Sequence, residues 1–183
     1  QRALQPERLV QQLSRFSAKD RLQALRSLGQ CAQEATLPLL GVIARVLNDA
    51  DSEVRRAALE VIAGFGQLAA PQSRQIANRL QDLDPELRTY AASSLGALGD
   101  VAVGHAADLR AALGDAEAVV RLAVVKAIGA IGPAVAQEAG AALVAHLGEA
   151  EDGAVRAASI EALVRLGGGA AGVLGGALES EDP

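Results

Sequence analysis

Large and chemically reactive side chains are scarce in this chain of 183 residues. Aromatic residues make up 2% of it, Trp and Met are absent, and Cys31 is the single cysteine. A lone cysteine excludes an intrachain disulfide and a cysteine-based metal cluster. Because there are few aromatic side chains, the chain offers few large anchors for a small-molecule pocket. The composition therefore favours a function that needs no cofactor, and we expect none.

Positive charge and long apolar runs are also limited. The net charge is −5 at pH 7, whereas nucleic acid is bound by a basic stripe that neutralises phosphates, so no nucleic-acid partner is expected. No run of about 18 apolar residues is free of charge. The first residues, which include Arg2, Pro6 and Glu7, lack the apolar core of a signal peptide. We therefore expect a soluble chain without a membrane span, and the sequence does not indicate its compartment.

What the chain does contain is an arginine that recurs in a similar apolar context. Successive copies are separated by 34, 33, 33 and 35 residues, and most of them follow a valine or a leucine. Such a regular recurrence indicates a stack of similar units, each too small to bury its own apolar face. The five copies are Arg21, Arg55, Arg88, Arg121 and Arg156.

Each arginine lies at the start of an amphipathic helix, which we call the first helix of its unit. Apolar or small residues follow it at the third, fourth, seventh and tenth positions, as at Ala58, Leu59, Ile62 and Phe65. This spacing covers one face of a helix. In four units the eleventh position is a glycine, which can adopt the backbone conformation that ends a helix. These glycines are Gly66, Gly99, Gly132 and Gly167.

A second helix follows in each unit, marked by two apolar residues four positions apart, such as Ile43 and Leu47. An acidic turn then leads to the next unit, and its Asp and Ser side chains can cap the next first helix. The recurring arginine lies about one turn into its helix, within reach of an acidic turn. We therefore predict that the five arginines form a structural ladder of ion pairs along one edge of the stack.

The string from Asp51 to Gly66, with Val54-Arg55 and Ala58-Leu59 inside it, resembles the HEAT repeat. It is most similar to the short variety known from phycocyanobilin lyases, and the resemblance covers roughly residues 18 to 178. The implied fold is all-α: an α-solenoid of antiparallel helix pairs that forms a single domain over residues 1–183. We expect an orphan second helix at 6–17, followed by repeats at 18–50, 51–83, 84–116, 117–151 and 152–183.

The two ends of the array depart from the pattern. Glycines crowd the fifth repeat between Gly167 and Gly176, and each costs about 1 kcal/mol relative to alanine inside a helix. We expect the helix at this end to fray or to be stabilised by packing against a molecule outside this chain. Together with the orphan helix at the other end, this suggests a portion of a longer solenoid or a subunit of a larger assembly.

The polar and reactive side chains do not form a catalytic or metal-binding constellation. His105 and His146 have no adjacent carboxylate, and we interpret them as surface histidines. Cys31 occupies the tenth position, which is apolar in the other units, so we interpret it as a buried small hydrophobe and not as a nucleophile. Tyr90 is either partly buried between repeats or an anchor for a partner. We therefore expect neither enzyme activity nor a bound metal.

Solenoids usually bind their partners through the helices that line the concave side, which we assign to the second helices. We hypothesise that this chain is a non-enzymatic scaffold, adaptor or assembly subunit that binds a protein partner of unknown identity. The alternative is a bilin lyase-like protein, implied only by the repeat resemblance. A nucleic-acid-binding solenoid is less favoured. The candidate partner-binding residues, which point away from the apolar pairs, are Arg45, Arg74, Gln75, Asn78 and Asp108.

Overall fold

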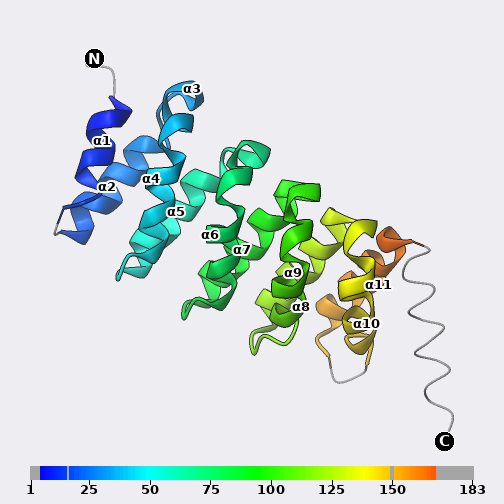
Figure 1. Cartoon of the computed structure of the whole chain (residues 1–183). Coiled ribbons are helices and arrows are strands. Elements are labelled where there is room, and N and C mark those ends of the chain that lie inside the picture. Colours follow the sequence, from blue (N-terminus) through cyan, green and yellow to red (C-terminus); the bar gives the residue numbers. More distant parts are fainter. Residues whose placement is uncertain (1–4, 16, 149–150, 168–183) are drawn as a thin grey trace, which may run out of the picture.

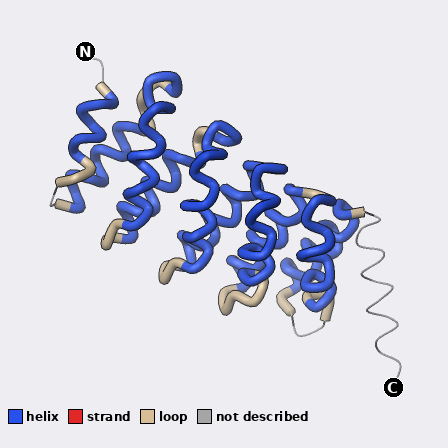
Figure 2. Tube along the Cα trace, viewed as in Figure 1, coloured by secondary structure: helices blue, strands red, loops and turns tan. Residues whose placement is uncertain are grey.

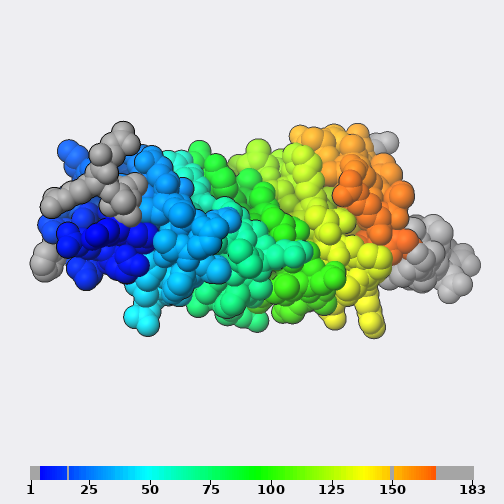
Figure 3. Space-filling view, turned by 90° about the horizontal axis from the view of Figure 1, so that it is seen from above, coloured from blue at the N-terminus to red at the C-terminus, as the bar shows by residue number. Residues whose placement is uncertain are grey.

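The computed structural model describes residues 5–15, 17–148 and 151–167, and every regular element in those segments is helical (Figures 1 and 2). Figure 1 shows the helices following one another along a single axis, from α1 at the N-terminal end to α11 at the other end. In the space-filling view of Figure 3, the colours keep their chain order along an elongated molecule. The protein is therefore an α-solenoid, as the repeat spacing predicts.

The first helices, each of which carries a recurring arginine, form one layer of the solenoid, which we call the first layer. Acidic residues cap several of them: the Asp51 side chain accepts hydrogen bonds from the backbone N–H groups of Glu53 and Val54. Asp84 and Asp152 cap the following helices in the same way. The first layer consists of α2 (Ala18–Leu28), α5 (Ser52–Ala63), α7 (Pro85–Leu98), α9 (Ala118–Ile131) and α11 (Gly153–Leu166).

The second helices form the other layer, called here the second layer, and are less regular than the sequence predicts. Their α-helical parts are short and are preceded or followed by 3-10 turns, some of which contain a proline that lacks the N–H needed for an α-helical hydrogen bond. The α-helical parts are α1 (Pro6–Gln12), α4 (Leu40–Arg45), α6 (Ser73–Asn78), α8 (Ala106–Ala112) and α10 (Ala136–Ala145). The linking segments are α3 (Gln33–Thr36), η1 (Leu37–Leu39), η2 (Val46–Asn48), η3 (Gly66–Gln72), η4 (Arg79–Gln81), η5 (Gly99–His105) and η6 (Pro133–Val135).

The glycines at the eleventh position end the first helices through their backbone conformation. Gly99 has φ +59° and ψ −131°, and Gly132 has φ +84° and ψ −157°. Residues with a side chain rarely adopt this region, whereas glycine enters it without strain. The chain can therefore turn sharply after α7 and α9 and run back as a second helix.

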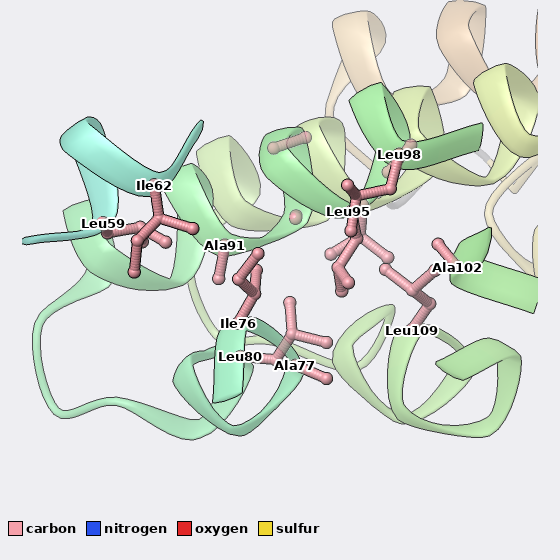
Figure 4. Packing of buried hydrophobic residues seen from close by; sticks show 14 of the residues in the cluster. Leu59, Ile62, Ile76, Ala77, Leu80, Ala91, Leu95, Leu98, Ala102 and Leu109 are labelled. Carbon is pink, nitrogen blue, oxygen red and sulfur yellow. The ribbon is translucent and has the colours of Figure 1, made fainter. Parts of the chain in front are cut away.

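The hydrophobic core lies between the two layers and continues from one repeat to the next. Figure 4 shows Leu59 of α5 and Leu95 of α7 on one side of this seam and Ile76 of α6 and Leu109 of α8 on the other. All four side chains are fully buried. The residues seven positions after each arginine are buried as well: Leu28, Ile62, Leu95, Ile128 and Leu163. The apolar spacing thus identified the face on which each unit packs against its neighbours.

Some predicted features lie outside the described residues. These include the second helix expected around Leu174 and Leu178 and most of the glycine-rich segment. The orphan helix at the other end is present as α1, and it packs against α2.

In the described part of the chain, no single helix is long and apolar enough to cross a membrane. The segments Ala118–Ile131 and Pro133–Ala145 meet the length and composition requirement only together, and the chain bends by 113° between them.

Candidate functional site

One edge of the solenoid carries a row of two-pronged ion pairs. Nε and Nη2 of Arg55 donate to Oδ2 and Oδ1 of Asp82, in the following turn, at 2.9 and 2.7 Å. Nη1 of Arg55 donates to the carbonyl oxygens of Asp49 and Ala50, in the preceding turn. Each such arginine therefore joins two successive turns of the stack. The equivalent pairs are Arg21 with Asp49, Arg88 with Asp115 and Arg121 with Glu151.

The ladder carboxylates are held in their charged form. Burial alone would raise the pKa of Asp82, but hydrogen bonds from Arg55 and from the Asp84 N–H lower it below its usual range. The hydrogen bond from Arg121 is the main cause that lowers the pKa of Glu151 to about 2, against burial and with help from His146. At neutral pH these ion pairs are therefore fully charged.

The last arginine of the ladder differs from the other four. Arg156, on α11, makes no ion pair or side-chain hydrogen bond with another described residue. The paired arginines take their carboxylates from residues 27 to 30 positions later. The corresponding positions for Arg156 lie outside the described residues.

The side chains predicted to form a binding face lie on the second layer, and the structure brings only two of them together. Nη1 of Arg74 on α6 lies 3.0 Å from Oδ2 of Asp108 on α8. This ion pair joins neighbouring repeats, and its positive and negative charges compensate each other. Arg45, Gln75 and Asn78 are exposed on α4 and α6, and no hydrogen bond or ion pair joins these three.

The solvent-facing side of the first layer is hollowed between neighbouring helices. Hollows of about 440 Å³ between α2 and α5, about 560 Å³ between α7 and α9, and about 280 Å³ between α9 and α11 open on this side. The last two share Lys126 of α9 as a common wall. We call them, with the surface between them, the first-layer groove. Its lining includes Ala97, Leu122, Ala123, Lys126, Ala130 and Ala158.

Glycines inside the first helices allow the walls of this groove to approach each other closely. A Cβ atom added to Gly96 of α7 would lie 2.9 Å from Cα of Ala127 on α9. A Cβ atom added to Gly129 of α9 would lie 3.2 Å from Cα of Ala162 on α11. A side chain at Gly96 would force α7 and α9 apart, whereas one at Gly129 would require α11 to give way by a few tenths of an ångström.

The first helices pack closely against one another in the C-terminal half of the stack. The pairs α7 with α9 and α9 with α11 share more extensive contacts than any other pair of elements in the described structure. The sequence-based assignment placed partner binding on the second helices at the concave side, and that assignment stays a prediction.

Several single residues also differ from their sequence-based interpretation. His105 is not a surface residue: it is buried, with Nδ1 3.5 Å from Oδ2 of Asp108, and its pKa is lowered by burial and by the nearby charge of Arg74. His146 is half-buried, with Nδ1 2.6 Å from Oε2 of Glu151.

Cys31 and Tyr90 are both more accessible than full burial would allow. Cys31 is half-buried and lines the hollow between α2 and α5, and burial raises the pKa of its thiol. Tyr90 is 42% exposed on α7. In the segments that the structure describes, no group of three or more His, Cys, Asp or Glu side chains is arranged to hold a metal ion.

Comparison with known families gives the evolutionary context of this architecture. The sequence model of HEAT repeats matches residues 6–76 and 71–164, which together make up most of the chain. The chain belongs to the HEAT repeat family. A search among curated proteins returns no match.

Solved structures share the fold of this HEAT repeat protein at low sequence identity. An engineered protein aligns over 97% of this chain and 90% of its own, with 20% identity and a TM-score of 0.72. The complex of CpcE and CpcF of phycocyanin lyase from Nostoc sp. PCC7120 aligns over 91% of this chain and 66% of that one, with 24% identity and a TM-score of 0.69. A computationally designed armadillo repeat protein for modular peptide recognition aligns over 86% of this chain and 80% of its own, with 21% identity and a TM-score of 0.69. These likenesses support the solenoid fold and carry no activity over to this chain.

The first-layer groove was missed at the sequence level because the arginine-bearing helices were assigned only a structural role. One signal pointed to it. Gly96 and Gly129 lie inside first helices, before the glycines that end them. Glycine inside a helix is unfavourable by about 1 kcal/mol, so its presence there marks a close approach of backbones.

Proposed function

We propose that this HEAT repeat protein is a non-enzymatic scaffold that binds a segment of a partner protein in the first-layer groove. The observation that carries the proposal is the pair of adjoining hollows over α7, α9 and α11, walled mainly by alanine, glycine and valine. The same layer exposes more than half of Val119, Ile160 and Val164. Apolar hollows and exposed apolar side chains are typical of protein interaction sites.

General properties of the fold also favour a protein partner. HEAT repeats generally form scaffolds for protein interaction, since their stacked helices present one long surface. Two of the structural neighbours are a complex of two proteins and a design for peptide recognition. These similarities support the class of partner and leave its identity open.

Site-specific photo-crosslinking tests where the partner binds. A photoreactive amino acid replaces Ala97 in the groove or, as the matched control, Asn78 on the second layer; both side chains are exposed on helices. We expect a crosslinked partner from position 97 and none from position 78, with mass spectrometry identifying the crosslinked peptide. Crosslinking only at position 78 would move the binding face to the second layer predicted from the sequence, and no crosslinked protein at either position would refute the scaffold proposal.

The bilin lyase-like alternative receives less support. A tetrapyrrole pocket usually has aromatic walls, and Phe65, in the hollow between α2 and α5, is the one aromatic side chain lining the three hollows described above. Phe65 itself is 8% exposed. Mixing the protein with phycocyanobilin and recording the visible spectrum tests this alternative, and an unchanged spectrum would count against it.

A further inference from the structure

Three charged side chains line the first-layer groove, and two of them pair with each other. Nη2 of Arg165 on α11 donates a hydrogen bond to Oε1 of Glu161 at 2.7 Å. Lys126 of α9 is different: it is exposed and makes no ion pair or hydrogen bond with another described residue. The groove therefore presents one uncompensated positive charge.

The position of Lys126 gives this charge a defined apolar context. Its side chain lines both hollows of the groove, the larger on the α7 side and the smaller on the α11 side. Ala97 and Leu122 contribute to the larger hollow. Ala158 and Ala162 line the smaller one together with the paired side chains of Glu161 and Arg165. A ligand that fills both hollows is therefore expected to carry two apolar groups with a negative charge between them.

The distance between the hollows selects the backbone conformation of such a ligand. Neighbouring packed helices lie about 8–10 Å apart, so two hollows on either side of α9 are separated by a similar distance. On a ligand helix, side chains at positions i and i+7 share a face and lie about 10.5 Å apart. On an extended strand, side chains on one face lie about 6.7 or about 13 Å apart. The helix fits the spacing, and the strand does not.

From this arrangement we infer that the occupant of the groove is an amphipathic helix of a partner protein. The helix places apolar side chains at i and i+7 in the two hollows and an Asp or Glu at i+3 or i+4 beside Lys126. This inference rests on the proposed function and specifies the chemistry of the partner. The charge pairing supplies specificity and orientation, and the apolar contacts supply most of the affinity.

A selection experiment with defined peptides tests the inference. The probe is a phage-displayed library of alanine-rich helical peptides in which positions i, i+3, i+4 and i+7 of one face vary freely. A second library, in which prolines prevent helix formation, provides the extended alternative. Each library is selected against the wild-type protein, Lys126→Glu, Lys126→Gln and the control Arg110→Glu, which changes an exposed charge on the second layer. Circular dichroism checks that every variant is folded.

We expect wild type and Arg110→Glu to select helical peptides with apolar residues at i and i+7 and Asp or Glu between them. Lys126→Glu should instead select Lys or Arg, and Lys126→Gln should show no charge preference. In a selected peptide, Glu→Lys should weaken binding to wild type about three- to tenfold, as expected for a partly exposed ion pair, and should strengthen binding to Lys126→Glu.

The inference is overturned if no helical peptide is enriched or if the proline-containing library yields the tighter binders. It is also overturned if wild type shows no preference for acidic residues, or if Lys126→Glu keeps that preference. Competition with the crosslink at position 97 separates this result from the proposed function. If the selected peptides block that crosslink but show no preference for acidic residues, the groove remains the binding site and the inferred chemistry of the partner is wrong. If the peptides bind outside the groove, both the proposed function and this inference are wrong.

Discussion

At the scale of single residues, the two acidic positions of a turn have different tasks. The side chain of Asp82 forms an ion pair with Arg55 and accepts a hydrogen bond from the backbone N–H of Asp84. The side chain of Asp84 instead caps α7. The arginine connects this turn to the carbonyl groups of the turn before it. We propose that the ladder is structural, because each arginine fixes the spacing of two successive turns and leaves little of its charge available to a ligand.

Truncating one arginine tests this role. Arg88→Ala removes two hydrogen bonds to Asp115, which is then left with its charge largely buried. We expect a loss of about 2–3 kcal/mol in the free energy of unfolding, measured by urea denaturation, because an uncompensated carboxylate remains. Arg88→Lys should recover only part of this loss, since an ammonium group cannot make the same two-pronged contact.

The matched control is Arg110→Ala, which removes an exposed arginine of α8. This change should alter stability by no more than about 0.5 kcal/mol. If Arg88→Ala and Arg110→Ala have the same effect, the ladder does not stabilise the fold.

Glu151 makes the ladder sensitive to acid. Its pKa in the folded protein is about 2, below the ordinary value of 4.5, so its contribution to stability is complete above pH 4.5 and is lost as the pH falls toward 2. We expect Glu151→Gln to lower stability at pH 7 by roughly 2 kcal/mol, with allowance for solvent screening, and to flatten the decline between pH 4.5 and 2. Urea unfolding across this pH range measures both effects, and an unchanged acid profile would contradict the assignment. Glu138→Gln, at an exposed position on α10, serves as the control.

At the scale of helices, the close contact between α7 and α9 depends on a missing side chain. Gly96→Ala places a methyl group within 3 Å of the α9 backbone at Ala127. We expect a net destabilisation of about 1–2 kcal/mol, because overpacking outweighs the gain of about 1 kcal/mol in helix propensity. Thermal unfolding, monitored by circular dichroism, shows whether Gly96→Ala stabilises or destabilises the protein.

Gly41→Ala is the matched control for the glycine experiment. Gly41 lies inside α4 with nothing within 4 Å of the added methyl group. This change should stabilise the protein by about 0.5–1 kcal/mol, since alanine restricts the unfolded chain and favours the helix. Stabilisation by both changes would mean that α7 and α9 are not held together by the glycine contact.

The first helices could be predicted from the sequence, whereas the second helices could be predicted only in part. Residues such as Leu59 and Ile62 recur at helical spacing and are buried as expected, because the 3.6-residue period decides which face packs inward. The 3-10 turns around α6 were missed. Pro71 lies inside η3, and local backbone constraints of this kind leave the apolar spacing unchanged.

The candidate site was less predictable, because it depends on distances between helices that are remote in sequence. The sequence pattern cannot tell where hollows open between neighbouring helices. The hollows beside Lys126 are the reason that our proposal places the binding face on the first layer and not at Arg74 and Asn78. His105 shows the same limit. Its burial and its contact with Asp108 result from packing in the second layer, whereas its neighbours in sequence suggest an exposed position.

At the scale of the whole molecule, each repeat contacts mainly the repeats before and after it. The extensive helix contacts join α2 to α5, α7 to α9 and α9 to α11, and they leave the two ends of the stack connected only through the units between them. Stability is then approximately a sum of the stabilities of single repeats and of the interfaces between neighbours. Local damage should therefore spread along the array and weaken with distance.

Hydrogen exchange can measure how far such damage spreads. Ile128→Ala removes a fully buried side chain of α9 and should cost about 2–5 kcal/mol in its own repeat, because it leaves a cavity. We expect faster exchange in α7, α9 and α11 and little change in α2, as resolved by mass spectrometry of peptide fragments. Leu25→Ala, at a fully buried position in α2, should give the opposite distribution and spare α11. Equal acceleration in all helices for both variants would mean that the solenoid unfolds as one cooperative unit, and the nearest-neighbour description would then fail.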